Sequence, residues 1–153
     1  MRLLGPIVAG LLVGAAVTAG GYAAASGDDA SAGPVRGPGT ADVVVTIRDS
    51  RFTPDRIRVW EGTQVRFEVR NTDPIGHELV VGPEALHERH RGGSEASHPP
   101  VPGEVSLGPG QTGATVYDAE RPGPVEIVCH LPGHEAYGMV GTVEVVARPD
   151  AAG

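Results

Sequence analysis

The feature that most constrains the fold of this chain is a series of short runs rich in β-branched residues. Residues 43–47 (Val-Val-Val-Thr-Ile) are β-branched throughout, and residues 56–60 and 64–70 carry an apolar side chain at every second position. A period of two is typical of strands that bury one face and expose the other. These runs therefore predict antiparallel sheets with one face on a core.

Similar runs continue to the end of the chain, at residues 79–81, 104–107, 112–117, 125–128 and 140–146. Gly (23) and Pro (14) together make up about a quarter of the 153 residues and supply the turns between the runs. Seven or eight short strands with such turns predict an all-β fold, a β-sandwich with Greek-key connections. Loops gather at the ends of a sandwich, so residues distant in sequence can meet there.

The composition divides the chain into four parts. Residues 1–25 begin with Met-Arg and continue almost uncharged, which predicts a cleaved signal peptide or an uncleaved membrane anchor through residues 3–25. Residues 26–41 are small, polar and rich in Gly and Pro, and predict a flexible linker. Residues 42–147 form the predicted domain, and residues 148–153 form a tail. Either reading of the N-terminus predicts an extracytoplasmic protein, secreted or anchored to the outer face of the cytoplasmic membrane.

One segment interrupts the strand pattern. Residues 82–103 are predicted to be an insertion, irregular or containing a short helix from Pro83 to Arg91, with Gly92 and Gly93 after it.

The charge pattern excludes one class of partner. The net charge is −7, every basic residue is Arg, and none of them forms a basic stripe, so nucleic-acid binding is not expected. The single domain is expected to be a monomer.

Three residues with metal-binding side chains recur at regular spacing near the C-terminus. Cys129, the only cysteine, is followed by His134 and then by Met139, the only methionine besides Met1. Singly, a cysteine can be a small buried hydrophobe and a methionine can fill a core. Together, thiolate, imidazole and thioether are the ligands of a copper site with two histidines, one cysteine and a weak axial methionine. Zinc gains almost nothing from a thioether, so the set predicts one copper ion.

The second histidine of such a site must come from elsewhere in the chain. His77 begins an apolar run and follows a loop, so it is the expected fourth ligand, although a surface histidine is the alternative. His130 adjoins Cys129, and in an extended chain its side chain points the opposite way. His87, His90 and His98 lie in the insertion; they are expected either to be solvated or to form a second copper or zinc site, since His87 and His90 share a helix face.

The residues His77 and Cys-x4-His-x4-Met at 129, 134 and 139 resemble the cupredoxin family of type 1 blue copper proteins. The loop spacing is similar to that of auracyanins and rusticyanin. The resemblance extends over residues 42–147 and includes further positions, namely Phe52-x-Pro54, Ile57-x-Val59, Gly62, Val65-x-Phe67, Asn71, His77-Glu78 and Gly108-Pro109-Gly110. It implies a Greek-key sandwich with one copper ion that cycles between Cu(I) and Cu(II). His77, Cys129 and His134 would bind this ion equatorially, and Met139 would bind it axially.

The resemblance also implies a function. A mononuclear site of this kind serves a one-electron carrier, whose redox partner docks on an apolar patch near His134 formed by Leu131, Pro132 and Ala136. Copper binding or delivery without a redox partner is the alternative. An enzyme is not expected, because a copper nitrite reductase needs a second copper and a further domain of this kind.

Overall fold

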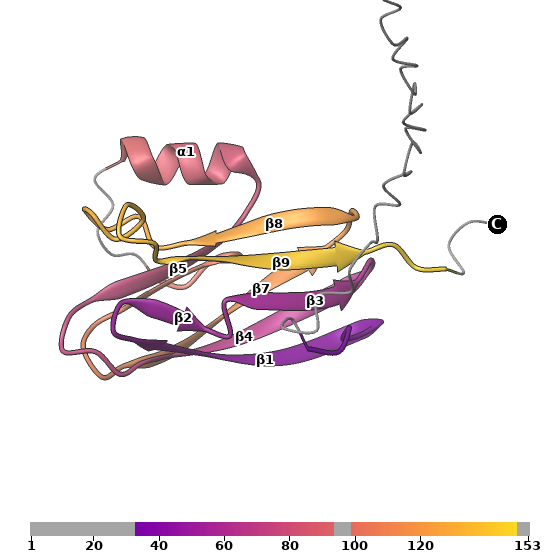
Figure 1. The fold of residues 1–153 in the computed structure, drawn as a ribbon, viewed down its shortest axis with the longest axis horizontal. Helices are drawn as coiled ribbons and strands as arrows, with labels where there is room; N and C mark the ends of the chain where they lie inside the picture. The colour runs from indigo at the N-terminus through magenta and orange to yellow at the C-terminus, as the bar shows by residue number, and fades with distance from the viewer. Residues whose placement is uncertain (1–32, 94–98, 150–153) are drawn as a thin grey trace, which may run out of the picture.

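The computed structural model describes residues 33–93 and 99–149. Within these residues, nine strands form two sheets that pack as a sandwich (Figure 1). The first sheet has the order β2 (Arg51–Thr53), β1 (Gly39–Arg48), β4 (Thr63–Asn71), β7 (Thr112–Ala119). The second has the order β3 (Arg56–Trp60), β9 (Val140–Val146), β8 (Gly123–Val128), β5 (His77–Gly82), β6 (Glu104–Leu107).

The core lies between the two sheets, as the alternating runs predict. In β4 every second residue is buried, so Val65, Phe67 and Val69 are each 0% exposed while their neighbours face solvent. Apolar residues of the second sheet, including Ile57 and Val143, belong to the same cluster. Burial of a side chain of this size contributes about 1.5–3 kcal/mol, so the core accounts for much of the driving force for folding.

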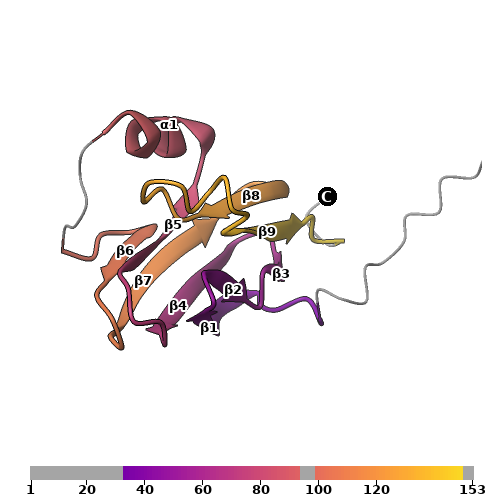
Figure 2. The same ribbon diagram turned by 60° about the vertical axis from the view of Figure 1, so that its left-hand side comes forward.

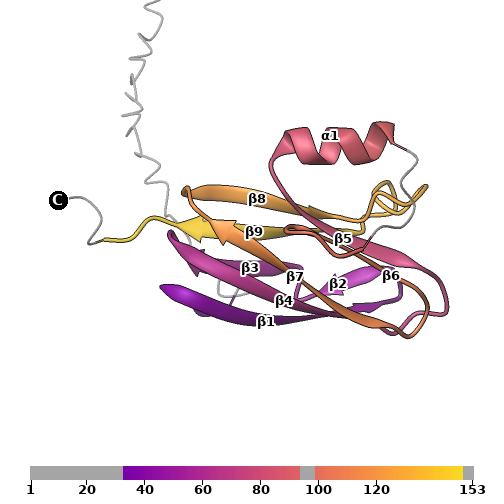
Figure 3. The same ribbon diagram turned by 180° about the vertical axis from the view of Figure 1, so that it is seen from behind.

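The predicted fold class, an all-β sandwich with Greek-key connections, is confirmed. Strands that are neighbours in a sheet are often distant in sequence: β1 lies beside β4, and β3 lies beside β9. These two pairs are parallel and the remaining pairs are antiparallel, whereas the sequence pattern predicts antiparallel pairs alone. Figure 3 shows from behind how β7 runs beside β4 at the edge of the first sheet.

Two details of the predicted organisation differ from the structure. Strand β2 was not expected, because its three residues are too few to show a period of two. It follows a two-residue turn in which Asp49 and Ser50 both have positive φ (51° and 54°), the geometry that matches the twist of a hairpin. Strand β1 begins at Gly39, inside the segment expected to be linker, and Arg36 pairs with Val59.

The insertion contains the expected helix, α1 (Glu84–Gly92), which lies outside the sandwich next to the sheet that contains β5 and β8 (Figure 2). Its first turn carries Glu84, and its last turn carries Arg89, His90 and Arg91, charges that favour the helix dipole. The two buried residues of the helix are Leu86 and His87. Because α1 covers one side of β5, that strand is buried along its whole length.

The signal peptide or anchor at 1–25, the tether through residues 3–25, residues 26–32 of the linker predicted at 26–41, His98 and the end of the tail at 148–153 lie outside the described residues. In the part of the chain that is described, no helix is both long and apolar enough to cross a lipid bilayer.

Candidate metal centre

The predicted ligands lie where strands of the second sheet begin or end. His77 is the first residue of β5, Cys129 directly follows β8, and Met139 directly precedes β9. His134 lies in the loop between β8 and β9, which is drawn in orange and yellow beside α1 (Figure 1). Since β5 and β8 are paired, with Val80 opposite Val128, the fold brings His77 to the loop despite the distance in sequence.

Three of the four residues meet. One ligand atom each from His77, Cys129 and His134 lies within 4.8 Å of the other two. Nδ1 of His134 is 3.2 Å from Nδ1 of His77 and 3.3 Å from Sγ of Cys129. His77 is 1% exposed and Cys129 is 0% exposed, whereas His134 is partly exposed. Such a group can hold one ion shielded from solvent, with His134 on the side nearest the surface.

The orientation of His77 is fixed by a residue that the sequence did not single out. Nε2 of His77 lies 2.8 Å from Oδ2 of Asp73, and a carboxylate can only accept, so the proton is on Nε2 and the lone pair is on Nδ1. Asp73 also accepts hydrogen bonds from the backbone N–H groups of Asp49 (2.8 Å) and Ser50 (2.9 Å). Burial raises the pKa of Asp73, but these hydrogen bonds outweigh it and hold that pKa below its usual value.

The thiol of Cys129 is buried and has two backbone donors. Burial raises its pKa to about 11, although the N–H of Glu78, 3.5 Å from Sγ, and the N–H of Leu131 favour the thiolate. The thiol is therefore protonated at neutral pH until a metal displaces the proton. The pKa of His134 is lowered, first by burial and then by the neighbouring His77, which keeps this imidazole neutral and able to bind a cation.

Met139 is 0% exposed and belongs to the same buried cluster as Cys129. The backbone joins the two residues, because Cys129 N–H donates to the carbonyl of Met139 at 3.2 Å. Within the loop, Met139 N–H donates to His134 O (3.0 Å) and His134 N–H donates to Leu131 O (3.0 Å). These hydrogen bonds close the loop and hold the backbone of Met139 beside Cys129 and His134.

His130 lies outside the ligand group, on the other side of the chain, as extended geometry predicts. Its ring contacts His87 and stacks on His90, with centroids 5.2 and 5.7 Å apart. The sequence predicts that His87 and His90 share a face of α1; it does not predict that they meet His130. The sequence did contain a signal for this position of His130. Glu78 and His130 each directly follow a predicted ligand, and successive side chains of an extended chain point to opposite sides, so both point away from the metal site toward α1.

The surface near His134 is partly apolar. Pro132 and Ala136 are exposed and Leu131 is partly buried, while Tyr137 in the same loop is 75% exposed. Ile75, two residues before His77, is 47% exposed.

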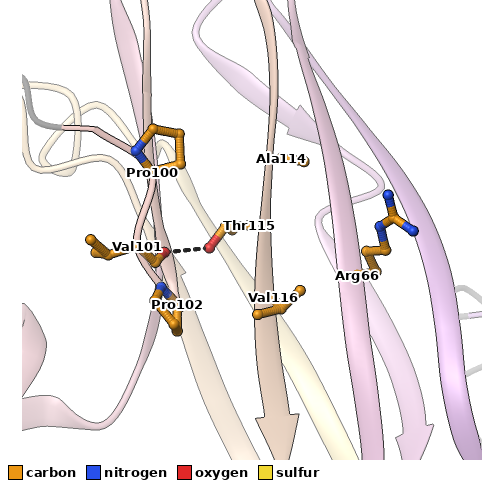
Figure 4. A pocket seen from close by; sticks show the side chains of 7 residues that line it. All are labelled: Arg66, Pro100, Val101, Pro102, Ala114, Thr115 and Val116. Carbon is orange, nitrogen blue, oxygen red and sulfur yellow. Dashed lines mark hydrogen bonds between the residues drawn. The ribbon is translucent and has the colours of Figure 1, made fainter.

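A separate pocket of about 240 Å³ lies against β4 and β7 and contains none of the predicted ligands (Figure 4). Its lining consists of Arg66, Pro100, Val101, Pro102, Ala114, Thr115 and Val116.

Two relatives of this chain share a name. A protein named copper-resistant cuproprotein CopI, from Rubrivivax gelatinosus, is 37% identical over 106 residues, which cover 67% of this chain and 64% of that protein. The chain therefore spans slightly less than two thirds of the length of that relative. The protein of the same name from Pseudomonas aeruginosa is 26% identical over 172 residues, covering 91% of this chain and 93% of the relative.

Solved structures share the fold. A reduced auracyanin from Roseiflexus castenholzii superposes with a TM-score of 0.57 at 21% identity, covering 69% of this chain and 96% of that one. A rusticyanin structure superposes with a TM-score of 0.51 at 20% identity, and the match covers 73% of this chain and 80% of rusticyanin. These identities are low, so the likeness concerns the fold. The sequence profile of the cupredoxin-like domain matches residues 15–143, which is most of the chain. The chain belongs to the family of cupredoxin-like domains.

Proposed function

We propose that this chain is a mononuclear type 1 copper protein that carries single electrons between redox partners outside the cytoplasm. The observation that supports it most directly is the convergence of His77 Nδ1, Cys129 Sγ and His134 Nδ1 within 4.8 Å of one another. Met139, buried in the same cluster as Cys129, is proposed as the weak axial ligand. Two imidazoles, one thiolate and an axial thioether form the donor set of blue-copper centres.

The donors favour copper over zinc. Zinc gains little from a thioether, and copper(II) stands above zinc in the affinity series for divalent ions. Copper bound here supplies a one-electron Cu(I)/Cu(II) couple. The chain supplies a dry site: His77 and Cys129 are buried, Asp73 orients His77, and the N–H of Glu78 points to the sulfur. Fixed ligands and hydrogen bonds around the sulfur tune the reduction potential.

Electrons would enter and leave through the partly exposed His134. We propose that a protein redox partner docks there on the apolar surface formed by Leu131, Pro132, Ala136 and Tyr137, and that the chain acts as a monomer. No substrate turnover is proposed. The signal peptide or anchor expected at residues 1–25 supports an extracytoplasmic location.

The experiment is an absorption spectrum of the purified, copper-loaded protein, followed by a redox titration. A strong visible thiolate-to-copper band that bleaches reversibly with one electron per chain is expected. Cys129→Ser should abolish the band, whereas Tyr137→Phe, in the exposed part of the same loop, should keep it. A colourless wild type with one copper bound, or a Cys129→Ser variant that stays blue, would contradict the ligand assignment.

Copper binding or delivery without a redox partner is a second candidate. It is favoured by the relatives named copper-resistant cuproproteins. The two functions differ in what happens on reduction, because an electron carrier keeps its metal in both states and a delivery protein gives up Cu(I). Copper retained after repeated reduction in the presence of a Cu(I) chelator would support the carrier; transfer of the copper to the chelator would support delivery.

A further inference from the structure

A second pair of imidazoles faces each other on the far side of Cys129. Nδ1 of His87, in α1, lies 2.9 Å from Nε2 of His130. This separation is similar to the 3.2 Å between the facing nitrogens of His77 and His134. Both rings are removed from solvent: His87 is 0% exposed, and the side chain of His130 is 2% exposed.

The outer nitrogen of each ring contacts a group that can only accept a hydrogen bond. Nε2 of His87 lies 3.2 Å from the carbonyl oxygen of Gly82, and Nδ1 of His130 lies 3.1 Å from Oε2 of Glu135. Glu135 also accepts hydrogen bonds from Arg91, which favours its carboxylate form. Both outer nitrogens therefore carry the proton, and in the neutral rings both facing nitrogens carry a lone pair.

Two lone pairs at 2.9 Å repel each other unless the two nitrogens share a proton or bind the same metal ion. Histidines that bind metals almost always donate the other ring N–H to a carboxylate or a backbone carbonyl, which fixes the tautomer. His87 donates to a carbonyl and His130 donates to a carboxylate. The pair thus has both the inward lone pairs and the outward hydrogen bonds of metal ligands.

The charges around the pair favour a cation. His90 of α1 stacks on His130, with Nε2 at 2.9 Å from Glu104 Oε2 of β6 and Nδ1 at 3.7 Å from Glu78 Oε1 of β5. The loop contributes Glu135, and α1 contributes Arg91. Among the described residues, no third histidine, cysteine or carboxylate joins the pair in a compact group, so the chain supplies two ligands to the proposed ion.

We propose that His87 and His130 form a second metal site, which takes a divalent first-row transition ion and binds copper(II) most tightly. Imidazole suits copper, zinc and nickel, and copper(II) leads the affinity series. Because Cys129 and His130 are adjacent and point to opposite sides, one peptide unit joins this site to the first. The inference does not depend on whether the first site carries electrons.

The test uses the full chain with its first site already filled with copper and the excess removed. Cu(II) is then titrated and followed by equilibrium dialysis and EPR. A second equivalent is expected, with the larger copper hyperfine splitting of a nitrogen- and oxygen-ligated ion and without new thiolate absorption. His87→Gln should weaken this equivalent at least about tenfold, which corresponds to about 1.4 kcal/mol, and leave the first site blue.

Glu88→Gln is the matched control, because Glu88 is exposed on the same helix; it should keep both equivalents. A second equivalent that is absent from the wild type, or unchanged in His87→Gln, would overturn the proposal and leave a shared proton between the rings. If His87→Gln does not fold, pulsed EPR of the wild type decides: coupling of the second copper to two imidazole nitrogens supports the site, and its absence overturns it.

Discussion

Asp73 and His77 are joined by a hydrogen bond of 2.8 Å between Oδ2 and Nε2, and the same carboxylate holds the turn between β1 and β2. One side chain therefore connects a proposed metal ligand in the second sheet to a hairpin in the first. Removing it should affect both the stability of the fold and the orientation of the imidazole.

We expect Asp73→Asn to lower the free energy of unfolding by about 1–3 kcal/mol near pH 7, because charge-assisted hydrogen bonds are lost. The folded-state pKa of Asp73 lies below its unfolded value. Its stabilisation is therefore present above about pH 4 and is lost as the pH falls through the lower folded-state pKa. Urea unfolding of both proteins at several pH values should show the difference narrowing in acid.

Asp42→Asn is the control for this experiment, because Asp42 is exposed on β1, and it should unfold like the wild type across the same range. A difference between Asp73→Asn and the wild type that stays constant down to pH 2 would show that the carboxylate charge does not stabilise the fold.

Copper uptake should release a proton from Cys129. Its thiol has a pKa of about 11 in the metal-free protein, and the metal binds the thiolate. Below that pKa, apparent copper affinity should rise by up to about tenfold per pH unit from this group. Calorimetry in buffers of different ionisation enthalpy, between pH 7 and 9, measures the number of protons released; a value of zero would exclude Cys129 as a ligand.

Met139→Leu should raise the reduction potential while copper stays bound. If Met139 is axial, its thioether stabilises Cu(II), and leucine removes that donor with little change in volume. The cost in stability should stay below about 1.5 kcal/mol. Voltammetry of the variant and of Val140→Ala, an exposed neighbour, provides the comparison; equal potentials in Met139→Leu and the wild type would place Met139 in the core alone.

Gly141→Ala should destabilise the sandwich by about 1–3 kcal/mol, the usual cost of overpacking. A Cβ at Gly141 would lie 2.7 Å from the carbonyl oxygen of Asp55, which accepts a hydrogen bond from Thr142 N–H. Gly92→Ala is the control, since a Cβ there meets nothing within 4 Å. Thermal unfolding measures both, and a Gly141→Ala variant as stable as Gly92→Ala would mean that the strand moves freely.

The sequence predicted those parts of the molecule that depend on local periodicity and on residue chemistry. Alternation located β4 and its buried face, and the spacing of Cys129, His134 and Met139 indicated a metal loop. Strand β2 was not predicted, because three residues are too few to show a periodicity. The role of Asp73 was not predicted, because it depends on contacts with the β1–β2 turn, which lies near Asp73 only in the folded chain.

The contact between His130 and His87 was not predicted either, because it also depends on how distant segments pack. Each histidine was assigned to its own segment, and no sequence pattern states that α1 packs over the loop that follows β8. The parallel pairs β1–β4 and β3–β9 were likewise hidden, because alternation gives the buried face of a strand but not the identity or direction of its neighbour.

The loop from Cys129 to Met139 satisfies much of its backbone within itself and joins the sandwich through the antiparallel pair β8–β9. We therefore expect that the loop can be replaced while β8 and β9 keep their pairing. A loop of another length, inserted between Val128 and Val140, would alter the coordination of the ion without requiring any new strand pairing. Loop length and strand pairing can thus be changed one at a time by evolution or by protein engineering, provided that Cys129 and Met139, which also belong to the buried core, are kept.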